Sequence, residues 1–414
     1  MNSSAKSPFR LAYLTGTYPA ASHTFIQREI ASLRALGSDI LITSIRRPDA
    51  VEIIGPEEEA AQAETFYILD DAKNPLKLLK AHGSLFAQSP MRWLRTLKLA
   101  LKTHRPGLKG LIWQMFYFLE AGVLGRELQQ REISHLHNHF ADSSATVAML
   151  SANFANIPFS FTLHGPTELF APESWHFAEK VKRAAMVMCI SHFARSQVML
   201  FSDPEHWSKL RIVHCGVTPA RYASTTASHG AGLKLLFVGR LAPVKGLRIL
   251  FEGFEAARKV RSDIELTVVG DGTDREWVEE NAKRLGGVTV LGYRSQSEVS
   301  EALEQSDVLV LPSFAEGVPV ALMEAMVSKR PVIATRVGGV AELIDHGVSG
   351  LLVAPSDSQG LADAMLQMAE SEEARHAMGE AGHAKVCAEF DIDKEAAWLK
   401  QLFEGTAGDT LRPE

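Results

Sequence analysis

One stretch decides the fold: residues Val308–Thr335, which run VLVLPSFAEGVPVALMEAMVSKRPVIAT. It opens with four aliphatic residues, breaks at Pro-Ser, continues as an apolar helical pattern and ends in a second short apolar run. Continuous Val, Ile and Leu runs on either side of a helix are typical of parallel strands buried on both faces. The stretch therefore predicts a strand–helix–strand unit of a parallel α/β sheet.

The same pattern repeats along the chain in two separate series. The first half contains six expected strands, with the sequences FRLAYLTG, DILITSI, HLHNHF, FSFTLHG, MVMCIS and LRIVHCG. The second half contains six more, with the sequences LKLLFVGR, IELTVVG, VTVLG, DVLVLPS, RPVIAT and GLLV. Two such series predict two doubly wound, Rossmann-like α/β domains, and a length of 414 residues agrees with two cores. Ligands of such sheets bind at the carboxyl ends of the strands, so we expect two domains facing an interdomain cleft.

The domain boundaries follow from a change in composition. Residues 1–216 are expected to form the N-terminal domain and residues 233–392 the C-terminal domain. Between them, residues 217–232 are rich in Ser, Thr, Ala and Gly, and we interpret them as a linker. Residues 393–414 are expected to form a final helix and a frayed tail. Whether this helix packs back on the N-terminal domain is left open.

Composition excludes several classes of protein. The formal net charge of −6 gives no reason to expect a nucleic-acid partner. The three cysteines are few and far apart, which argues against a disulfide framework or a structural zinc site and favours a reducing compartment. The start of the chain lacks a signal-peptide pattern, and no segment approaches twenty uninterrupted apolar residues. We therefore expect a cytoplasmic protein that does not span a membrane.

One segment has a charge opposite to that of the whole chain. From Lys73 to Lys109 there are nine cations and no acid, interleaved with Leu, Phe and Trp. On helices this pattern gives basic and apolar faces, which together attract a peripheral protein to anionic lipid. The alternative is a solvated pair of helices packed on its own domain. Because the local charge opposes the net charge, we prefer an amphipathic insert, residues 73–110, that contacts the inner face of the cell membrane.

Two acids flank the expected helix start within the opening stretch. Pro319 suits the first turn of a helix, so the preceding residues should lie at the positive end of the helix dipole. The backbone expected there comprises Gly317, Val318, Pro319 and Val320. Such an end binds anions. If the spacing were wholly helical, Glu316 and Glu324 would lie about 12 Å apart along the axis, and could hold hydroxyl groups on both sides of a bound diphosphate.

A second loop supplies positive charge. The run LLFVGRLAPVKG ends a strand at Gly239 and Arg240 and places Lys245 directly before Gly246. A guanidinium fork and a lysine ammonium on one strand-to-helix loop can clamp a diphosphate. Either cation alone would more often be an ordinary surface charge. Their pairing in one loop, together with the two acids, favours an anion site.

These segments resemble a known family. FVGRLAPVKG, VGDGTDREWVEE, LGYRSQSEV and SFAEGVPVALMEAMVSKRPVIATRVGGVAELIDHGVSGLLV are similar to glycosyltransferase family 4, the retaining transferases with the GT-B fold. In the N-terminal half, YLTGTYPAASHTFIQREIASLRALG, LHNHFA and FTLHGPTELF resemble bacterial members that assemble exopolysaccharide, including the colanic-acid type. The resemblance implies an N-terminal acceptor domain and a C-terminal nucleotide-sugar domain.

The resemblance implies roles for the matching residues of the C-terminal half. Arg240 and Lys245 match the pair that neutralises the donor diphosphate, next to Gly239. Glu316 matches the acid beside the transferred sugar, and Glu324 matches the acid that receives the ribose hydroxyls. The backbone expected to lie along the base is that of Gly292, Tyr293 and Arg294.

In the N-terminal half the match is less complete. His164 matches a histidine near the reacting centre, but Thr167 stands where relatives often have Asp, and Glu168 follows it. The residues that match a loop near phosphate and acceptor are Gly16, Ser22, His23 and Thr24. Many relatives have two adjacent glycines in this loop, whereas this chain has TGTYPAAS.

The implied reaction is transfer of a hexose, with retention, from a nucleotide-diphosphate sugar to a lipid-linked saccharide. Two cations and a helix N-terminus would stabilise the leaving diphosphate electrostatically, without a metal ion. We therefore expect no metal or cofactor, and a UDP- or GDP-sugar as donor.

Two carboxylates close together are needed for a double displacement. Glu316 and Glu324 do not fit that requirement in spacing or role, so front-face attack is favoured, in which the leaving phosphate helps to deprotonate the acceptor. The alternatives are a nucleotide-sugar epimerase of the same fold and a catalytically silent binding module at the membrane.

Three histidines raise the question of a metal. His135, His137 and His139 alternate along an expected strand and would lie on one face, as zinc ligands could. No fourth ligand is evident except Asp142 nearby. Polar residues satisfied near the strand end are the preferred interpretation.

Overall fold

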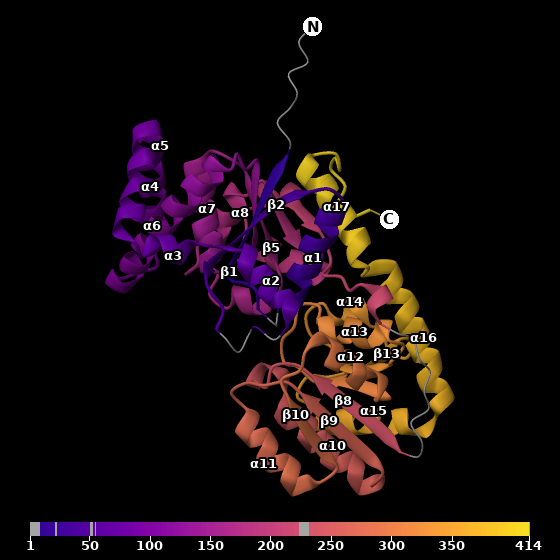
Figure 1. Cartoon of the computed structure of the whole chain (residues 1–414). Coiled ribbons are helices and arrows are strands. Elements are labelled where there is room, and N and C mark those ends of the chain that lie inside the picture. The colour runs from indigo at the N-terminus through magenta and orange to yellow at the C-terminus, as the bar shows by residue number, and fades with distance from the viewer. Residues whose placement is uncertain (1–8, 21–22, 50–52, 54, 223–231, 414) are drawn as a thin grey trace. The chain divides into compact units, whose positions relative to one another are not determined.

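The computed structural model describes residues 9–20, 23–49, 53, 55–222 and 232–413, without the side chains of residues 166 and 167 (Figure 1). The chain divides into two compact units. Unit 1 comprises Met1–Val213 and Ala396–Glu414, and unit 2 comprises His214–Glu395. The chain therefore leaves unit 1 once, builds the whole of unit 2, and returns.

Unit 1 contains a parallel sheet in which the described strands have the order β3-β2-β1-β4-β5-β6-β7. These strands are β1 (Arg10–Thr17), β2 (Asp39–Arg46), β3 (Phe66–Tyr67), β4 (His135–His139), β5 (Phe159–Leu163), β6 (Met186–Cys189) and β7 (Leu210–Ile212). All six predicted strands of this half are confirmed, and β3 is too short for its pattern to be recognised. Because β1 pairs with β2 on one side and with β4 on the other, the order reverses beside β1. That reversal is where doubly wound sheets bind ligands.

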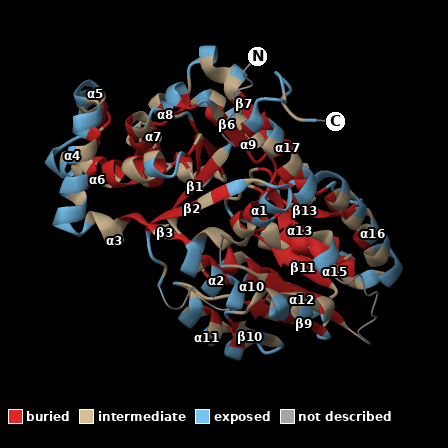
Figure 2. Ribbon diagram, turned by 45° about the horizontal axis from the view of Figure 1, so that its top comes forward, coloured by how far each residue is buried: buried red, intermediate tan, exposed pale blue. Residues whose placement is uncertain are grey.

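Helices connect these strands. They are α1 (Thr24–Ala35), α2 (Pro56–Glu64), α3 (Ile68–Ala72), α4 (Pro75–Gln88), α5 (Pro90–Lys102), α6 (Leu108–Gln130), α7 (Ser143–Ala155), α8 (Phe177–Arg183), α9 (His192–Leu200) and α17 (Ile392–Glu404). The strands are buried, and the exposed residues lie on the outer sides of the helices (Figure 2). The predicted basic insert forms α4, α5 and the start of α6, which stand out from the side of the sheet (Figure 1). Pro75 and Pro90 begin two of these helices, where a missing N–H costs nothing.

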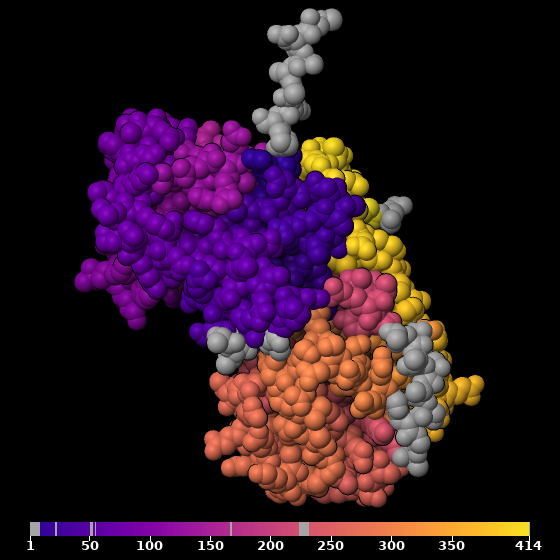
Figure 3. Space-filling model, viewed as in Figure 1, coloured from indigo at the N-terminus to yellow at the C-terminus, as the bar shows by residue number. Residues whose placement is uncertain are grey.

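The last helix completes the core of unit 1. Trp398, Leu402 and Phe403 of α17 are buried in one cluster with Tyr13 and other residues near β1. The indole N–H of Trp398 donates to the carbonyl of Ile212 at 3.0 Å. The C-terminal segment, in yellow, lies against the indigo part of unit 1 (Figure 3). The sequence left the place of this helix open, and the structure assigns it from Ala396 onward to unit 1, with its first residues in unit 2.

Two expectations need correction, one about the C-terminal tail and one about the start of the linker. The tail was expected to fray, but the carbonyl of Leu411 accepts a hydrogen bond from the N–H of Ile212 at 3.0 Å, so the tail continues along β7. Val217, interpreted as linker, belongs to unit 2, because it exchanges backbone hydrogen bonds of 2.9 Å with Phe390 and Ile392. The linker residues 223–231 lie outside the described residues.

Unit 2 contains a parallel sheet with the described order β10-β9-β8-β11-β12-β13. Its strands are β8 (Leu233–Val238), β9 (Ile264–Val269), β10 (Val288–Gly292), β11 (Val308–Leu311), β12 (Val332–Thr335) and β13 (Gly350–Val353). Its helices are α10 (Leu247–Val260), α11 (Arg275–Leu285), α12 (Gln296–Glu304), α13 (Val320–Val327), α14 (Val340–Leu343), α15 (Ser358–Glu370) and α16 (Glu372–Glu389). The opening stretch is β11, α13 and β12, as predicted. The order reverses between β8 and β11.

The two sheets confirm the predicted fold class of two Rossmann-like α/β domains. The cleft expected between the domains stays a prediction. In the described part of the chain, every helix is too short or too polar to cross a bilayer.

Replacing Trp398 by Ala should destabilise unit 1 by about 3–5 kcal/mol, because a buried indole and its hydrogen bond are lost from the core. Urea unfolding of the whole chain, followed by circular dichroism, measures the change. Gln401→Ala on the exposed side of the same helix is the control and should cost less than about 0.5 kcal/mol. Equal effects would show that α17 is not part of this core.

Candidate functional site

In unit 2, two loops leave the sheet where the strand order reverses. One follows β8 and spans residues 239–246, and the other follows β11 and spans residues 312–319. β8 and β11 are hydrogen-bonded neighbours and parallel, so both loops start at the same edge of the sheet. This edge, at a topological switch point, is the expected ligand site of the domain.

Lys245 and Glu316 join these two loops. The Nζ of Lys245 donates a hydrogen bond to Oε1 of Glu316 at 2.6 Å, and the two side chains are only 19% and 11% exposed. Such enclosure makes the attraction stronger than that of a surface ion pair. The N–H of Phe314 also donates to the carbonyl of Val244 at 2.8 Å. A cation and an acid predicted from separate motifs are therefore in direct contact.

Two glycines allow the backbone to come this close. Gly246 has a φ of +65°, and a Cβ there would strike the carbonyl of Pro312. Gly338, after β12, has a φ of +53°, and a Cβ there would strike the carbonyl of Glu316. The N–H of Gly339 donates to the carbonyl of Gly317 at 2.8 Å. The backbone that carries Glu316 is thus held against two neighbouring loops.

Glu324 lies inside α13, apart from this loop. It is 9% exposed, and its Oε1 accepts a hydrogen bond from the hydroxyl of Tyr222 at 2.8 Å. The helix begins at Val320, with Pro319 as its N-cap in an extended conformation. The expectation of Pro319 in the first turn was therefore wrong by one residue. The 12 Å estimate does not apply, because Glu316 precedes the helix and the spacing is only partly helical.

The other predicted donor residues lie in loops at the same edge. Gly239 directly follows β8, and its N–H donates to the carbonyl of Val269 at 3.0 Å. Arg240 is exposed and forms no ion pair with any residue that the structure describes. The carbonyl of Gly292, at the end of β10, accepts from the N–H of Gly270 at 2.8 Å. The loops after β8, β9 and β10 are therefore linked in series.

The two residues that follow Gly292 are accessible. Tyr293 is 40% exposed, and the guanidinium Nε of Arg294 lies 3.5 Å from a carboxylate oxygen of Glu298 on α12. Gly292 itself is buried, so only the two residues after it are accessible at this edge of the sheet. The contact of this backbone with a base stays a prediction.

Replacing Gly338 by Ala should destabilise unit 2 by about 2–4 kcal/mol, because the left-handed backbone is strained and the new methyl group overlaps the Glu316 carbonyl. Gly347→Ala is a matched control. Gly347 has a φ of +79° but nothing within 4 Å of a built Cβ, so it should cost about 1–2 kcal/mol from strain alone. Thermal unfolding measures both. Equal losses would show that the close approach to Glu316 is unimportant.

In unit 1, rings gather near the carboxyl ends of β4 and β5. Ring centroids are 4.8 Å apart for Phe140 and His164, 5.0 Å for His23 and Phe140, and 4.7 Å for Phe25 and His164. His23 precedes α1, so the structure brings together two of the predicted residues, His23 and His164. Neither motif alone indicated that they would meet.

The remaining residues of the predicted acceptor loop lie at or on either side of residues 21 and 22, which the structure does not describe. Gly16 is in β1, and nothing lies within 4 Å of a built Cβ there. Thr24 is the first residue of α1. Ser22 lies outside the described residues. Their contact with an acceptor stays a prediction.

The ring of His164 contacts His139 on β4. Nε2 of His164 lies 2.8 Å from Nδ1 of His139. Nε2 of His139 lies 3.4 Å from Oε1 of Glu29 on α1, and this oxygen also accepts a hydrogen bond from the hydroxyl of Tyr13 at 2.6 Å. Burial, together with the neighbouring His139 and His23, holds the pKa of His164 well below its usual range, so the ring is neutral at pH 7. The sequence did not show this partner of His164.

The other two strand histidines are satisfied by hydroxyl groups. The ring nitrogens of His137 lie 2.8 Å from the hydroxyl of Ser160 and 3.0 Å from that of Thr162. Nε2 of His135 lies 2.7 Å from the same Ser160 hydroxyl. Burial lowers the pKa of His135 to about 4. The preferred interpretation of satisfied polar residues is confirmed for this pair.

Glu29, His137 and His139 bring potential ligand atoms within 4.8 Å of one another. Both ring nitrogens of His137 are already bonded to hydroxyl groups, so coordination would require those bonds to break. Two histidines and one carboxylate also lack the fourth protein ligand of a structural zinc site. That this site holds no metal stays a prediction.

Glu168 organises the loop after β5. The oxygens of its carboxyl group accept hydrogen bonds from the backbone N–H groups of His164 at 2.7 Å, Gly165 at 2.9 Å and Ala141 at 2.5 Å. Burial raises the pKa of Glu168 to about 8, although the three N–H groups act in the opposite direction. Glu168 therefore fixes the backbone of His164, and the ring of His164 is positioned by His139.

The raised pKa of Glu168 predicts a pH dependence of stability. The folded chain keeps this proton up to about pH 8, whereas the unfolded chain loses it near pH 4.5, so the stabilisation is complete at low pH and is lost as the pH rises from 5 to 8. The difference in unfolding free energy between the wild type and Glu168→Gln should shrink over this window. Glu173→Gln, at an exposed position on the same loop, should keep the wild-type pH profile. A constant difference between wild type and Glu168→Gln would contradict the shift.

Two family profiles match the chain, one in each half. The profile described as Glycosyltransferase Family 4 matches residues 51–221, and the profile described as Glycosyl transferases group 1 matches residues 232–371. Together they cover more than half of the sequence. The chain belongs to glycosyltransferase family 4.

Relatives of this glycosyltransferase include enzymes of polysaccharide assembly. The amylovoran biosynthesis glycosyltransferase AmsK of Erwinia amylovora is 26% identical, with 96% of this chain and 100% of AmsK covered. The putative colanic acid biosynthesis glycosyltransferase WcaL of Salmonella typhimurium is 23% identical, with 85% and 89% covered.

Among solved structures, the glycosyltransferase is similar to Anabaena HepE, which was crystallised with UDP-glucose. The TM-score is 0.72 at 17% identity, with 96% of this chain and 99% of HepE covered. At this identity the likeness concerns the fold alone. It agrees with the GT-B architecture of two Rossmann-like domains.

Proposed function

We propose that the protein is a retaining hexosyltransferase that moves a sugar from a nucleotide diphosphate to a lipid-linked saccharide during assembly of a cell-surface polysaccharide. The contact between Lys245 and Glu316 at the switch point of unit 2 carries the proposal. A bound donor would present its diphosphate to the ammonium of Lys245 and its sugar hydroxyls to the carboxylate of Glu316. Substrate would then replace an internal ion pair with two matched contacts.

Loss of the diphosphate leaves negative charge on the phosphate and positive charge on the sugar ring. Lys245, Arg240 and the first amides of α13 would stabilise the leaving group, since preorganised charges are effective where charge develops. These groups would stabilise the leaving group without a bound metal ion. The leaving phosphate would help to deprotonate the acceptor in a front-face attack.

The cluster around His164 is proposed to lie on the acceptor side of the reacting centre. A neutral imidazole held by His139 can form a directed hydrogen bond without adding a charge that would repel the developing cation on the sugar. Glu168 supports the same residue through its backbone. His164 is therefore proposed to orient a hydroxyl group of the sugar or acceptor.

The names of the relatives support the class of product and donor. AmsK and WcaL are named for amylovoran and colanic acid biosynthesis, and HepE was crystallised with UDP-glucose. We propose a UDP- or GDP-sugar as donor. The basic insert, residues 73–110, would hold the enzyme peripherally at the inner face of the membrane, where lipid-linked acceptors are found.

Incubation of the protein with UDP- and GDP-sugars, with and without a lipid-linked saccharide acceptor, tests the transfer. Nucleotide diphosphate released only when acceptor is present supports it. An altered sugar formed without acceptor would identify an epimerase, and binding of donor without turnover under any condition would identify a silent module. Retention follows from the anomeric configuration of the product.

Glu316→Gln should lower the turnover number by more than tenfold, because one carboxylate oxygen that accepts hydrogen bonds from the sugar is replaced by an amide nitrogen, which only donates. A tenfold change corresponds to about 1.4 kcal/mol of barrier. Glu301→Gln on exposed α12 is the matched control and should leave turnover unchanged. Wild-type turnover in Glu316→Gln would exclude this residue from the place beside the sugar.

A further inference from the structure

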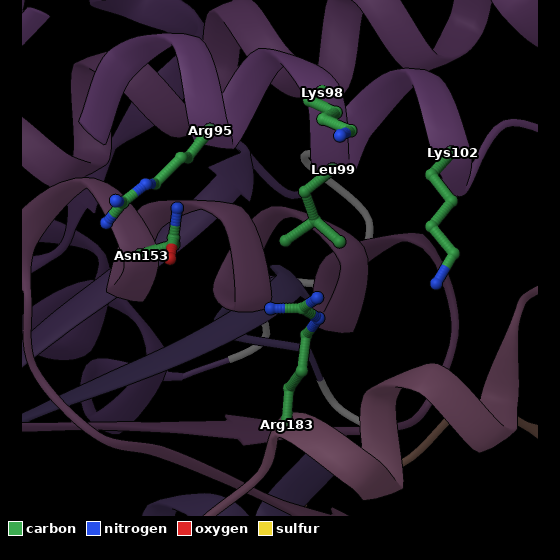
Figure 4. A pocket seen from close by; sticks show the side chains of 6 residues that line it. All are labelled: Arg95, Lys98, Leu99, Lys102, Asn153 and Arg183. Carbon is green, nitrogen blue, oxygen red and sulfur yellow. The ribbon is translucent and has the colours of Figure 1, made fainter. Parts of the chain in front are cut away.

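A basic pocket lies in unit 1 among α5, α7 and α8. Its volume is about 370 Å³, and the residues that line it are Arg95, Lys98, Leu99, Lys102, Asn153 and Arg183. Arg95 lies beside Asn153, and Arg183 extends from the opposite side toward Leu99 (Figure 4). Four of the six lining residues are cations, which is a strong bias toward an anionic ligand.

The pocket is remote from the cluster around His164. That cluster is next to the start of α7 at Ser143, whereas Asn153 is near the end of the same helix. Ten residues of helix separate these positions by about 15 Å. Arg183 ends α8, three residues before β6 begins at Met186, which places it at the amino edge of the sheet. The pocket is therefore distinct from the cluster around His164.

The positive charge of the pocket is only partly balanced. Glu179 is 2.6 Å from Nε of Arg183 and 3.4 Å from Nζ of Lys102. Arg95 and Lys98 form no ion pair with any residue in the described ranges. Like charges three and four residues apart destabilise a helix, so folding gives no reason for Arg95, Lys98 and Lys102 to share one side of α5. A bound anion would remove this repulsion.

Exposed apolar residues adjoin the pocket. Met91, Leu94 and Leu101 are 61%, 49% and 44% exposed. At 100° per residue they lie within about a quarter turn of Lys98 on the surface of α5. The neighbouring α6 adds the exposed residues Leu108, Ile112, Trp113 and Phe116. A soluble anion makes no use of such residues, whereas a membrane surface contacts cations with its phosphates and apolar side chains with its acyl layer.

We propose that this pocket binds the phosphate headgroup of an anionic phospholipid, while the apolar residues of α5 and α6 enter the same leaflet. The inference rests on the proposed membrane association and adds a defined site to it. Arg95 and Arg183 would hold phosphate oxygens with their guanidinium forks, and Lys98 would add a point charge. Arg183 is outside the basic run of the insert, so a general electrostatic surface does not require it.

Two triple variants with the same loss of charge test the pocket. Arg95→Gln/Lys98→Gln/Arg183→Gln removes three cations from the pocket, and Lys73→Gln/Lys80→Gln/Lys109→Gln removes three exposed cations elsewhere on the insert. Cosedimentation with phosphatidylglycerol–phosphatidylcholine vesicles measures binding of the whole chain. Both variants lose the attraction of three cations, so the effect of the pocket is the difference between them: the pocket variant should bind at least tenfold more weakly than the control variant.

A third variant should change vesicle binding in the opposite direction, which guards against misfolding as an explanation. Glu179→Gln removes the acid that neutralises Arg183 and Lys102, and should strengthen vesicle binding at least twofold. Weaker or unchanged binding of Glu179→Gln would overturn the proposed site.

The outcomes separate the pocket from the membrane association on which it rests. Equal weakening of both triple variants would overturn the pocket and leave membrane association intact. Failure of the wild type to bind any anionic vesicle would overturn both, without affecting the transferase activity measured on its own. If soluble inorganic phosphate or RNA bound the pocket as tightly as vesicles do, its ligand would be a soluble anion and not a lipid. That result would also overturn the proposal.

Discussion

The ion pair between Lys245 and Glu316 is the contact on which the C-terminal domain's site depends. It joins the loops of the two central strands, β8 and β11, at the edge where the strand order reverses. Gly246 and Gly338 have positive φ angles, and their backbones lie so close to the carbonyl groups of Pro312 and Glu316 that a Cβ would clash. The pair also prepares the site for its proposed ligand. Lys245 would exchange the Glu316 carboxylate for the diphosphate, and Glu316 would exchange the ammonium for sugar hydroxyls.

The fold followed from pattern because its strands are buried on both faces. Twelve short runs, most of them aliphatic, were enough to locate all but one of the described strands, and the missed strand, β3, has two residues. The sequence did not show which domain α17 packs on, because a helix has the same periodic apolar face whichever core it covers. The tail was misjudged because its contact with β7 is made by backbone groups, such as the carbonyl of Leu411, and these leave no mark on the side-chain pattern.

The site was only partly predictable for a related reason. Sequence patterns mark strand ends and helix starts, and this was enough to recognise Arg240, Lys245, Glu316 and Glu324. The contact between Lys245 and Glu316 depends on the tertiary structure and could not be predicted. The partner of His164 was missed, because His139 and Glu29 come from β4 and α1, which become neighbours only when the sheet is assembled. The proline at 319 shows the limit of local rules, since it stands one residue before the helix it was expected to begin.

The path of the chain has a consequence for synthesis. Unit 1 is begun first, yet Tyr13 and its neighbours are covered by Trp398 and Phe403 only after all of unit 2 has been made. On the ribosome, the earlier domain therefore waits with an open apolar surface while the later domain, which is continuous from His214 to Glu395, can fold to completion. A gene fragment for the second domain can be cut from the middle of the sequence, whereas one for the first must join two distant ends.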